Sequence, residues 1–199
     1  MRIVLSGPPS IGKTTQGKKM AESLGIPHIS SGALIRHRAA HGDPRAQHLA
    51  EIVSDGSLAP SNDIVDMVLE RIALPDCRKG FILDGFPRKI IEAQALLAVE
   101  KIDAFIALRA RDSVLLSRVL ERGRQSNMLR LDDDPEAFPR RIHIYKEQTA
   151  GVSAVMAAAG VDVHNIDAEG EANEVWDAIR RLLRAPETPG SELQVALAF

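Results

Sequence analysis

The sequence holds a single cysteine, Cys77, and few aromatic residues, which make up 4% of its 199 positions. One cysteine forms no internal disulfide and excludes a zinc site built from several thiolates. No apolar run approaches the roughly 18 residues of a membrane span. The apolar stretch at residues 3–5 is too short for a signal peptide. These absences predict a cytoplasmic protein with no membrane partner.

A strong excess of charge is also missing, because 25 Lys and Arg residues face 27 Asp and Glu residues. General nucleic-acid binders usually carry an overall basic domain, so no nucleic-acid partner is expected. The length fits one domain. The hydrophobic share of 45% and the charged share of 26% are typical of a soluble globular chain and exclude wholesale disorder.

Short apolar runs alternate with helical patterns, and this alternation predicts an α/β fold around a parallel sheet. The first helix is expected over 13–24, with Gly25 as its stop. Two more helices are expected to start at Asp43 and Asp134, each followed by proline. Pro139 predicts that the second of these begins late or bends. Five strands are expected, at residues 3–6, 28–30, 81–84, 104–108 and 161–164.

The strongest motif, Gly-Pro-Pro-Ser-Ile-Gly-Lys-Thr, occupies residues 7–14. It fits the pattern G-x-x-x-x-G-K-[ST] and lies between a predicted strand and a predicted helix, the context that confirms such a match. Main-chain N–H groups of such a loop bind phosphate oxygens. Lys13 is expected to reach the outer phosphates, and Thr14 or Thr15 to reach Mg²⁺. The residues expected to bind a nucleoside triphosphate here are Gly7, Ser10, Ile11, Gly12, Lys13, Thr14 and Thr15.

A second motif, Asp84-Gly85-Phe86-Pro87-Arg88, follows a predicted strand. The carboxylate of Asp84 is suited to hold Mg²⁺ through water beside the phosphate loop. The guanidinium of Arg88 offers a planar fork for a phosphate. Taken singly, Asp84 is equally well a turn residue and Arg88 a surface charge, but the joint pattern favours a second phosphate site.

Through these motifs the chain resembles the adenylate kinases and, more broadly, the nucleoside monophosphate kinases, over residues 1–183. The resemblance also rests on Ile-Ser-Ser-Gly at 29–32 and on Arg-Leu-Asp-Asp at 130–133, followed by Arg141 and Tyr145. It implies a three-layer P-loop NTPase-type fold with a five-stranded parallel sheet. It also implies transfer of the γ-phosphoryl group of MgATP to a nucleoside monophosphate, with AMP expected, in a monomer that uses Mg²⁺ as cofactor.

The resemblance further implies a domain organisation. A single kinase domain is expected over 1–184, with a core formed by 1–29, 60–116 and 142–184. A helical insertion at 30–59 is expected to bind the nucleoside monophosphate. A lid is expected at 117–141, and because it is short and lacks cysteine it resembles the short-lid branch of the family. Residues 185–199 are expected to form a C-terminal tail.

On the donor side, the resemblance assigns Arg118 and Arg122 to ATP. The two arginines are four apart on a predicted helix and therefore share a face. Gly170 falls where a main-chain carbonyl touches the donor adenine. Arg130 and Arg141 match the pair around the transferred phosphoryl group. The catalytic residues implied by the resemblance are Lys13, Asp84, Arg88, Arg122, Arg130 and Arg141.

On the acceptor side, Ser31 stands near the nucleoside, where the family usually has threonine. Arg36 and Arg88 match the residues that grip the acceptor phosphate, and residues 56–59 match the wall of the base pocket. The acceptor-binding residues implied by the resemblance are Ser31, Arg36, Ser57, Leu58, Ala59, Gly85, Arg88, Glu92, Arg130 and Arg141.

Some positions depart from the family pattern. Ser10 and Thr14 replace usual glycines, and both still fit the general phosphate-loop motif. Ala33 stands where the family usually has an aspartate that orders the waters of Mg²⁺, which puts metal affinity or rate in question. A nucleotide-binding protein with little catalysis is therefore the alternative from a different functional class.

Glu92 is the most informative departure, because adenylate kinases usually have glutamine there. An ionised carboxylate only accepts hydrogen bonds. It suits guanine, with its adjacent N1–H and N2–H₂ donors, better than adenine, so GMP or another nucleotide is the alternative acceptor. In a further interpretation Glu92 is a solvated helix charge, and main-chain groups near Gly85 read the base.

Overall fold

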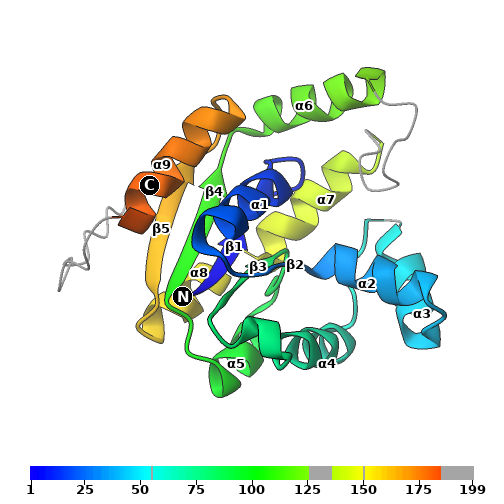
Figure 1. Ribbon diagram of the computed structural model, residues 1–199. Helices are drawn as coiled ribbons and strands as arrows, with labels where there is room; N and C mark the ends of the chain where they lie inside the picture. The colour runs from blue at the N-terminus through cyan, green and yellow to red at the C-terminus, as the bar shows by residue number, and fades with distance from the viewer. Residues whose placement is uncertain (55, 126–135, 150, 185–199) are drawn as a thin grey trace.

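The structure is a computed structural model and describes residues 1–54, 56–125, 136–149 and 151–184. Its centre is a parallel five-stranded sheet with the strand order β2-β3-β1-β4-β5, and helices lie on both of its sides (Figure 1). This arrangement confirms the predicted α/β three-layer fold. The strands are β1 (Arg2–Ser6), β2 (His28–Ser30), β3 (Phe81–Asp84), β4 (Ala104–Arg109) and β5 (Asp162–Asp167).

The helical segments follow the strands in the order expected of parallel crossovers. Within the described ranges, no helix is both long enough and apolar enough to cross a membrane. The helical segments are α1 (Lys13–Leu24), α2 (Ser31–Ala40), α3 (Pro44–Ser54), α4 (Ser61–Ile72), η1 (Pro75–Cys77), α5 (Ile90–Val99), α6 (Asp112–Gln125), α7 (Phe138–Ile144), η3 (Tyr145–Thr149), α8 (Val152–Ala158) and α9 (Ala172–Arg184).

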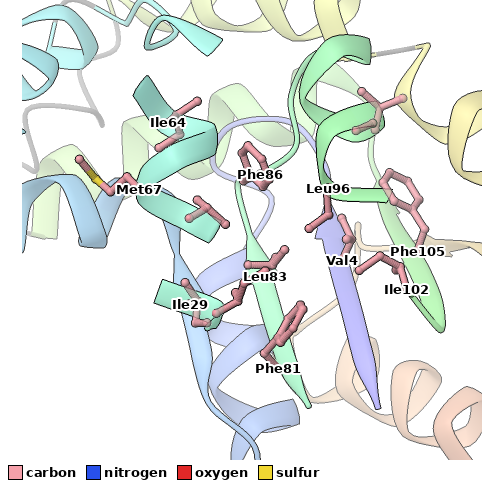
Figure 2. Close-up of a cluster of buried hydrophobic side chains, with 14 of the residues drawn as sticks. Val4, Ile29, Ile64, Met67, Phe81, Leu83, Phe86, Leu96, Ile102 and Phe105 are labelled. Atoms are coloured by element: carbon pink, nitrogen blue, oxygen red, sulfur yellow. The ribbon is translucent and has the colours of Figure 1, made fainter. Parts of the chain in front are cut away.

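Two hydrophobic clusters, one on each face of the sheet, hold these layers together. Side chains alternate between the faces of a strand, so Val4 of β1 joins one cluster while Ile3 and Leu5 join the other. The cluster around Val4 is shared with α2, α3, α4, α5 and α8, and Figure 2 shows Phe86 and Ile64 within it. The cluster around Ile3 is shared with α1, α6, α7 and α9.

The parallel topology brings the two sequence motifs together. Parallel strands end at one edge of the sheet, and ligands bind outside their carboxyl ends. In the register, Asp84 at the end of β3 pairs with Leu5 of β1 and with Ser30 of β2. The phosphate loop after β1, the Asp84 turn after β3 and the insertion after β2 therefore meet at this edge.

Most predicted element boundaries are confirmed. The strands at 28–30 and 81–84 and the helix at 13–24 have the predicted bounds. Helix α3 starts after Asp43, whose carboxylate accepts from the N–H groups of Arg45 and Ala46. Pro139 lies in the first turn of α7, so this helix begins late, as expected. The predicted start at Asp134 lies outside the described residues.

Strand β5 differs from the prediction, which placed it at 161–164 with both faces covered. The observed strand runs from 162 to 167, and its side chains are exposed or half-buried. It is one of the two edge strands of the sheet, and its polar residues give no continuous apolar run. The apolar pattern in the sequence therefore placed the end of this strand at residue 164, before its actual end at Asp167.

Gly80, the residue before β3, allows a test of how closely the starts of β1 and β3 approach each other. Its φ is +135°, and a Cβ there would lie 2.1 Å from the main-chain oxygen of Met1, which accepts the N–H of Phe81 at 3.2 Å. We expect Gly80→Ala to lower the free energy of unfolding by about 1–2 kcal/mol for the backbone conformation and by about 1–3 kcal/mol more for the clash.

Gly160→Ala is the matched control, because Gly160 has φ +78° and no atom within 4 Å of a Cβ. Urea denaturation compares the two variants, and we expect the larger loss of unfolding free energy in Gly80→Ala. Equal losses in the two variants would contradict a close approach at Gly80.

Candidate functional site

The phosphate loop is shaped by residues with positive φ. Gly7 has φ +152°, Ser10 +62° and Gly12 +95°, and a Cβ at Gly7 would lie 3.0 Å from the main-chain oxygen of Leu108. Ile11 is 3% exposed and belongs to the core, so only its main chain is available to a phosphate. The amine of Lys13 donates to the carbonyls of Gly7 at 2.8 Å and Pro8 at 2.7 Å, which holds it over the loop.

Asp84 connects this loop to the rest of the site. It is 3% exposed, and its Oδ2 accepts from the Thr14 hydroxyl at 2.9 Å and lies 3.2 Å from Nε2 of His28. Burial raises the pKa of Asp84, but the hydrogen bond from His28 and the charge of Lys13 outweigh burial and leave this pKa below its ordinary value. The structure thus brings Thr14, rather than the exposed Thr15, to the carboxylate.

Two adjoining cavities lie at the carboxyl edge of the sheet. The loop cavity, of about 510 Å³, is lined by Gly7, Lys13 and Tyr145 among others. The insertion cavity, of about 610 Å³, is lined by residues of α2, by the segment between α3 and α4, and by Glu92. The residues that line both cavities are Gly56, Leu58, Gly85, Phe86, Arg88 and Arg141.

The turn after β3 positions the guanidinium of Arg88 at this junction. Nε of Arg88 donates to the carbonyl of Gly85 at 2.8 Å, and the hydroxyl of Ser31 donates to the same oxygen at 2.8 Å. Thr149 Oγ1 donates to the carbonyl of Arg88 at 3.0 Å. Arg141 approaches from α7, where its Cγ lies 2.9 Å from the point that a Cβ of Gly56 would occupy.

Most predicted acceptor-side residues gather around the insertion cavity. Arg36 lies on α2 and is exposed, and Ser57 accepts a hydrogen bond from Arg140 of α7 at 2.8 Å. The predicted acceptor residues that line the cavity are Ser31, Arg36, Ser57, Leu58, Ala59, Gly85, Arg88, Glu92 and Arg141. Arg130 lies outside the described residues.

Glu92 is built into the start of α5 rather than extended into solvent. It is 2% exposed, so the interpretation of Glu92 as a solvated helix charge is wrong. Its Oε2 accepts from the main-chain N–H of Arg88 at 2.7 Å and of Lys89 at 3.3 Å, and its Oε1 accepts from the Ser61 hydroxyl at 3.1 Å. Glu92 therefore caps the start of α5 by accepting from the N–H groups of the N-cap residue Lys89 and of the residue before it.

The predicted donor-side residues lie on α6 and in the segment between β5 and α9. Arg118 donates to the carbonyls of Glu169 and Gly170, both at 2.9 Å. The carboxylate of Glu169 is paired with the guanidinium and the main-chain N–H of Arg111, and these bonds lower its pKa to about 2. Arg122 lies in α6, but its side chain is outside the described part of the chain.

Sequence reasoning did not find several residues of the site. His28 is the partner of Asp84, and Ser61 is the partner of Glu92. Tyr145 belongs to the pattern of the resemblance but was assigned no role; it lines the loop cavity, and burial raises the pKa of its phenol. His28 and Ser61 carry no motif, and only the strand register, with His28 opposite Ile82 two positions before Asp84, signals the first pair.

A parallel sheet with a phosphate loop after its first strand, joined to a second cavity through shared arginines, defines a phosphotransferase of the nucleoside monophosphate kinase class. Residues 5–160 match the family model "Adenylate kinase". The chain belongs to the adenylate kinase family.

Individual relatives agree with the family match along nearly the full chain. The chain is 38% identical over 194 residues to an adenylate kinase of Beijerinckia indica. This alignment covers 93% of this chain and 100% of the relative. It is 39% identical over 193 residues to an adenylate kinase of Methylobacterium nodulans, covering 92% and 96%. An adenylate kinase of Xanthomonas oryzae is 35% identical over 188 residues, covering 92% and 99%.

The ion pair between Arg111 and Glu169 leads to a prediction for the segment between β5 and α9. Arg111→Gln removes the guanidinium bonds that lower the Glu169 pKa, so we expect this pKa to rise from about 2 toward the ordinary value of about 4.3. NMR titration of the glutamate carboxyl carbons measures it. Arg180→Gln, which removes a different exposed ion pair, is the control. A Glu169 pKa unchanged in Arg111→Gln would contradict the pairing.

Proposed function

We propose that the protein transfers the γ-phosphoryl group of MgATP to AMP and so forms two molecules of ADP. The proposal combines the family membership with the geometry of the site. ATP is assigned to the loop cavity and AMP to the insertion cavity.

The observation that carries this proposal is that the two cavities share one wall. The loop cavity contains Lys13, the insertion cavity contains Arg36, and Arg88 and Arg141 line both. A phosphoryl group passing between two nucleotides crosses such a junction. An enzyme that used water as the acceptor would have no need of a second cavity, lined by arginines, beside the phosphate loop.

The charges at the junction suit the reaction. Phosphoryl transfer proceeds through a loose transition state with negative charge on the transferred group, so positioning and charge neutralisation carry most of the catalysis. Arg88 and Arg141 present planar guanidinium groups that bind phosphate oxygens in pairs. Lys13 adds a point charge above the loop. The proposed roles of Arg122 and Arg130, and of the lid, follow from the resemblance alone.

The residues present also fit Mg²⁺. The cation prefers hard oxygen ligands and keeps several waters when it binds with a nucleotide. The lowered pKa of Asp84 keeps its carboxylate ionised, and the Thr14 hydroxyl lies 2.9 Å away. We infer that Thr14 contacts the ion and that Asp84 holds its waters. Bound Mg²⁺ supplies charge neutralisation on the β- and γ-phosphates.

A coupled assay of ADP formation with AMP, GMP, CMP and UMP, with and without Mg²⁺, tests the proposed function. We expect turnover of AMP in preference to the other three and dependence on Mg²⁺. Lys13→Ala is expected to lower kcat by about 10²-fold or more, because it removes a charge aimed at the transferred phosphates, while its circular dichroism spectrum stays that of the wild type. Turnover of GMP alone would contradict the proposed acceptor.

The same preparation tests the alternative of a nucleotide-binding protein with little catalysis. That alternative predicts ATP binding by calorimetry with no ADP formed from any of the four monophosphates. ADP formation that is lost in Lys13→Ala excludes it.

Ala33 generates a prediction for the use of the metal. It lies in the first turn of α2 and is exposed, and the family usually has aspartate there. We expect Ala33→Asp to lower the Mg²⁺ concentration needed for half-maximal activity by about tenfold, the effect typical of one outer-shell ligand. Ala40→Asp, at the exposed end of the same helix, is the control. An unchanged Mg²⁺ requirement in Ala33→Asp would mean that the position has no part in metal binding.

A further inference from the structure

Gln16 is a buried polar residue of α1 to which the proposed function gives no role. It lies three residues after Lys13 and is 2% exposed, although glutamine is mostly an exposed residue in folded proteins. Its Nε2 donates to the carbonyl of Ala172, where α9 begins, at 2.9 Å. The bond joins two helices that pack beside each other on one face of the sheet.

The other end of the Gln16 amide argues against a role in core packing alone. Among the described residues, its Oε1 is buried and accepts no hydrogen bond. A buried polar atom without a partner is unfavourable, and an apolar side chain of the same size would avoid that penalty. The bond from Nε2 to Ala172 is therefore what glutamine contributes at this position and an apolar residue would not.

The carbonyl that Gln16 binds lies at the end of the segment between β5 and α9. From the other side of this segment, Arg118 of α6 donates to the carbonyls of Glu169 and Gly170. Lys19 of α1 adds a hydrogen bond to Asn173, but that bond is exposed and competes with water. Gln16 thus supplies the link between α1 and this segment that starts from a buried side chain.

These contacts place Gln16 between the two ends of the proposed ATP site. The phosphates are assigned to the loop that leads into Lys13, three residues before Gln16. The resemblance assigns the adenine to the carbonyl of Gly170, two residues before Ala172. The hydrogen bond between Gln16 and Ala172 therefore connects the element that follows the phosphates to the segment assigned to the base.

We infer that Gln16 is a positioning residue for the donor nucleotide. Its amide holds the segment between β5 and α9 at the distance from the phosphate loop that one ATP molecule spans. A ligand that contacts both ends of a site gains affinity when the two ends are already at the right separation, whereas a ligand that contacts the loop alone gains nothing from this bond. The inference rests on the proposed function, because it places the phosphates of ATP on the loop and its adenine at Gly170.

Inorganic tripolyphosphate provides the test, because it carries the phosphates of ATP without the base. Steady-state assays with AMP and Mg²⁺ give the KM for ATP and the inhibition constant of tripolyphosphate against ATP. Gln16→Met keeps the size of the side chain and removes the amide. In this variant we expect the KM for ATP to rise about five- to tenfold, the range of one hydrogen bond. We expect kcat and the inhibition constant of tripolyphosphate to stay within about twofold of the wild type, since only binding of the base is weakened.

Gln47→Met is the matched control, because Gln47 is an exposed glutamine of α3 whose Nε2 also donates to a main-chain carbonyl, that of Ala39. We expect wild-type constants for both ligands in this control. Gln16→Leu, with a shorter apolar side chain, repeats the test without the volume of methionine, and the same pattern is expected.

An equal rise in both constants would mean that Gln16 shapes the phosphate loop, and an unchanged KM for ATP would mean that its bond to Ala172 has no part in binding. Either result would overturn the inference. Loss of the folded state in both Gln16 variants would also overturn it, because Gln16 would then be a core residue. Formation of ADP from ATP and AMP by the wild type leaves the proposed function standing in all these cases, whereas a wild type without this activity overturns both.

Discussion

A buried, ionised carboxylate at the end of β3 is the constraint on which the site depends. A carboxylate at 3% exposure is costly unless hydrogen-bond donors and positive charge surround it. Asp84 receives these from α1, through Thr14 and Lys13, and from β2, through His28. The hydrogen bonds of the Asp84 carboxylate thereby hold the phosphate loop against the turn that carries Gly85 and Arg88. This turn forms part of the wall that both cavities share.

The sequence predicted the parts of the molecule whose signals are local. The phosphate loop is recognisable because its eight residues must provide positive φ, a close approach of the main chain to phosphate, and a lysine. The structure shows positive φ at Gly7, Ser10 and Gly12. The strand at 81–84 was predictable because it is buried on both faces. The end of β5 was not, because an edge strand with polar side chains lacks the apolar run on which the prediction depended.

The parts that sequence reasoning missed depend on which strands and helices become neighbours. His28 reaches Asp84 only because β2 pairs with β3 in one register. Ser61 reaches Glu92 only because α4 packs beside α5. Neither contact is encoded by spacing along the chain, since the partners are 56 and 31 residues apart. The chemistry of Glu92 was therefore judged from the side chain alone, as an open carboxylate facing a base.

The start of α5 shows why that judgement changes once the neighbours are known. The first N–H groups of a helix need acceptors, and a glutamate three residues into the helix supplies them through one of its oxygens. The same carboxylate lines the insertion cavity, so the requirement of the helix decides which oxygen is left for a nucleotide. A glutamine whose oxygen capped α5 in this way would turn its amide N–H₂ toward the cavity, and a glutamate offers only an acceptor there. In this chain the Ser61 hydroxyl donates to that acceptor, so the same carboxylate joins the start of α5 to α4.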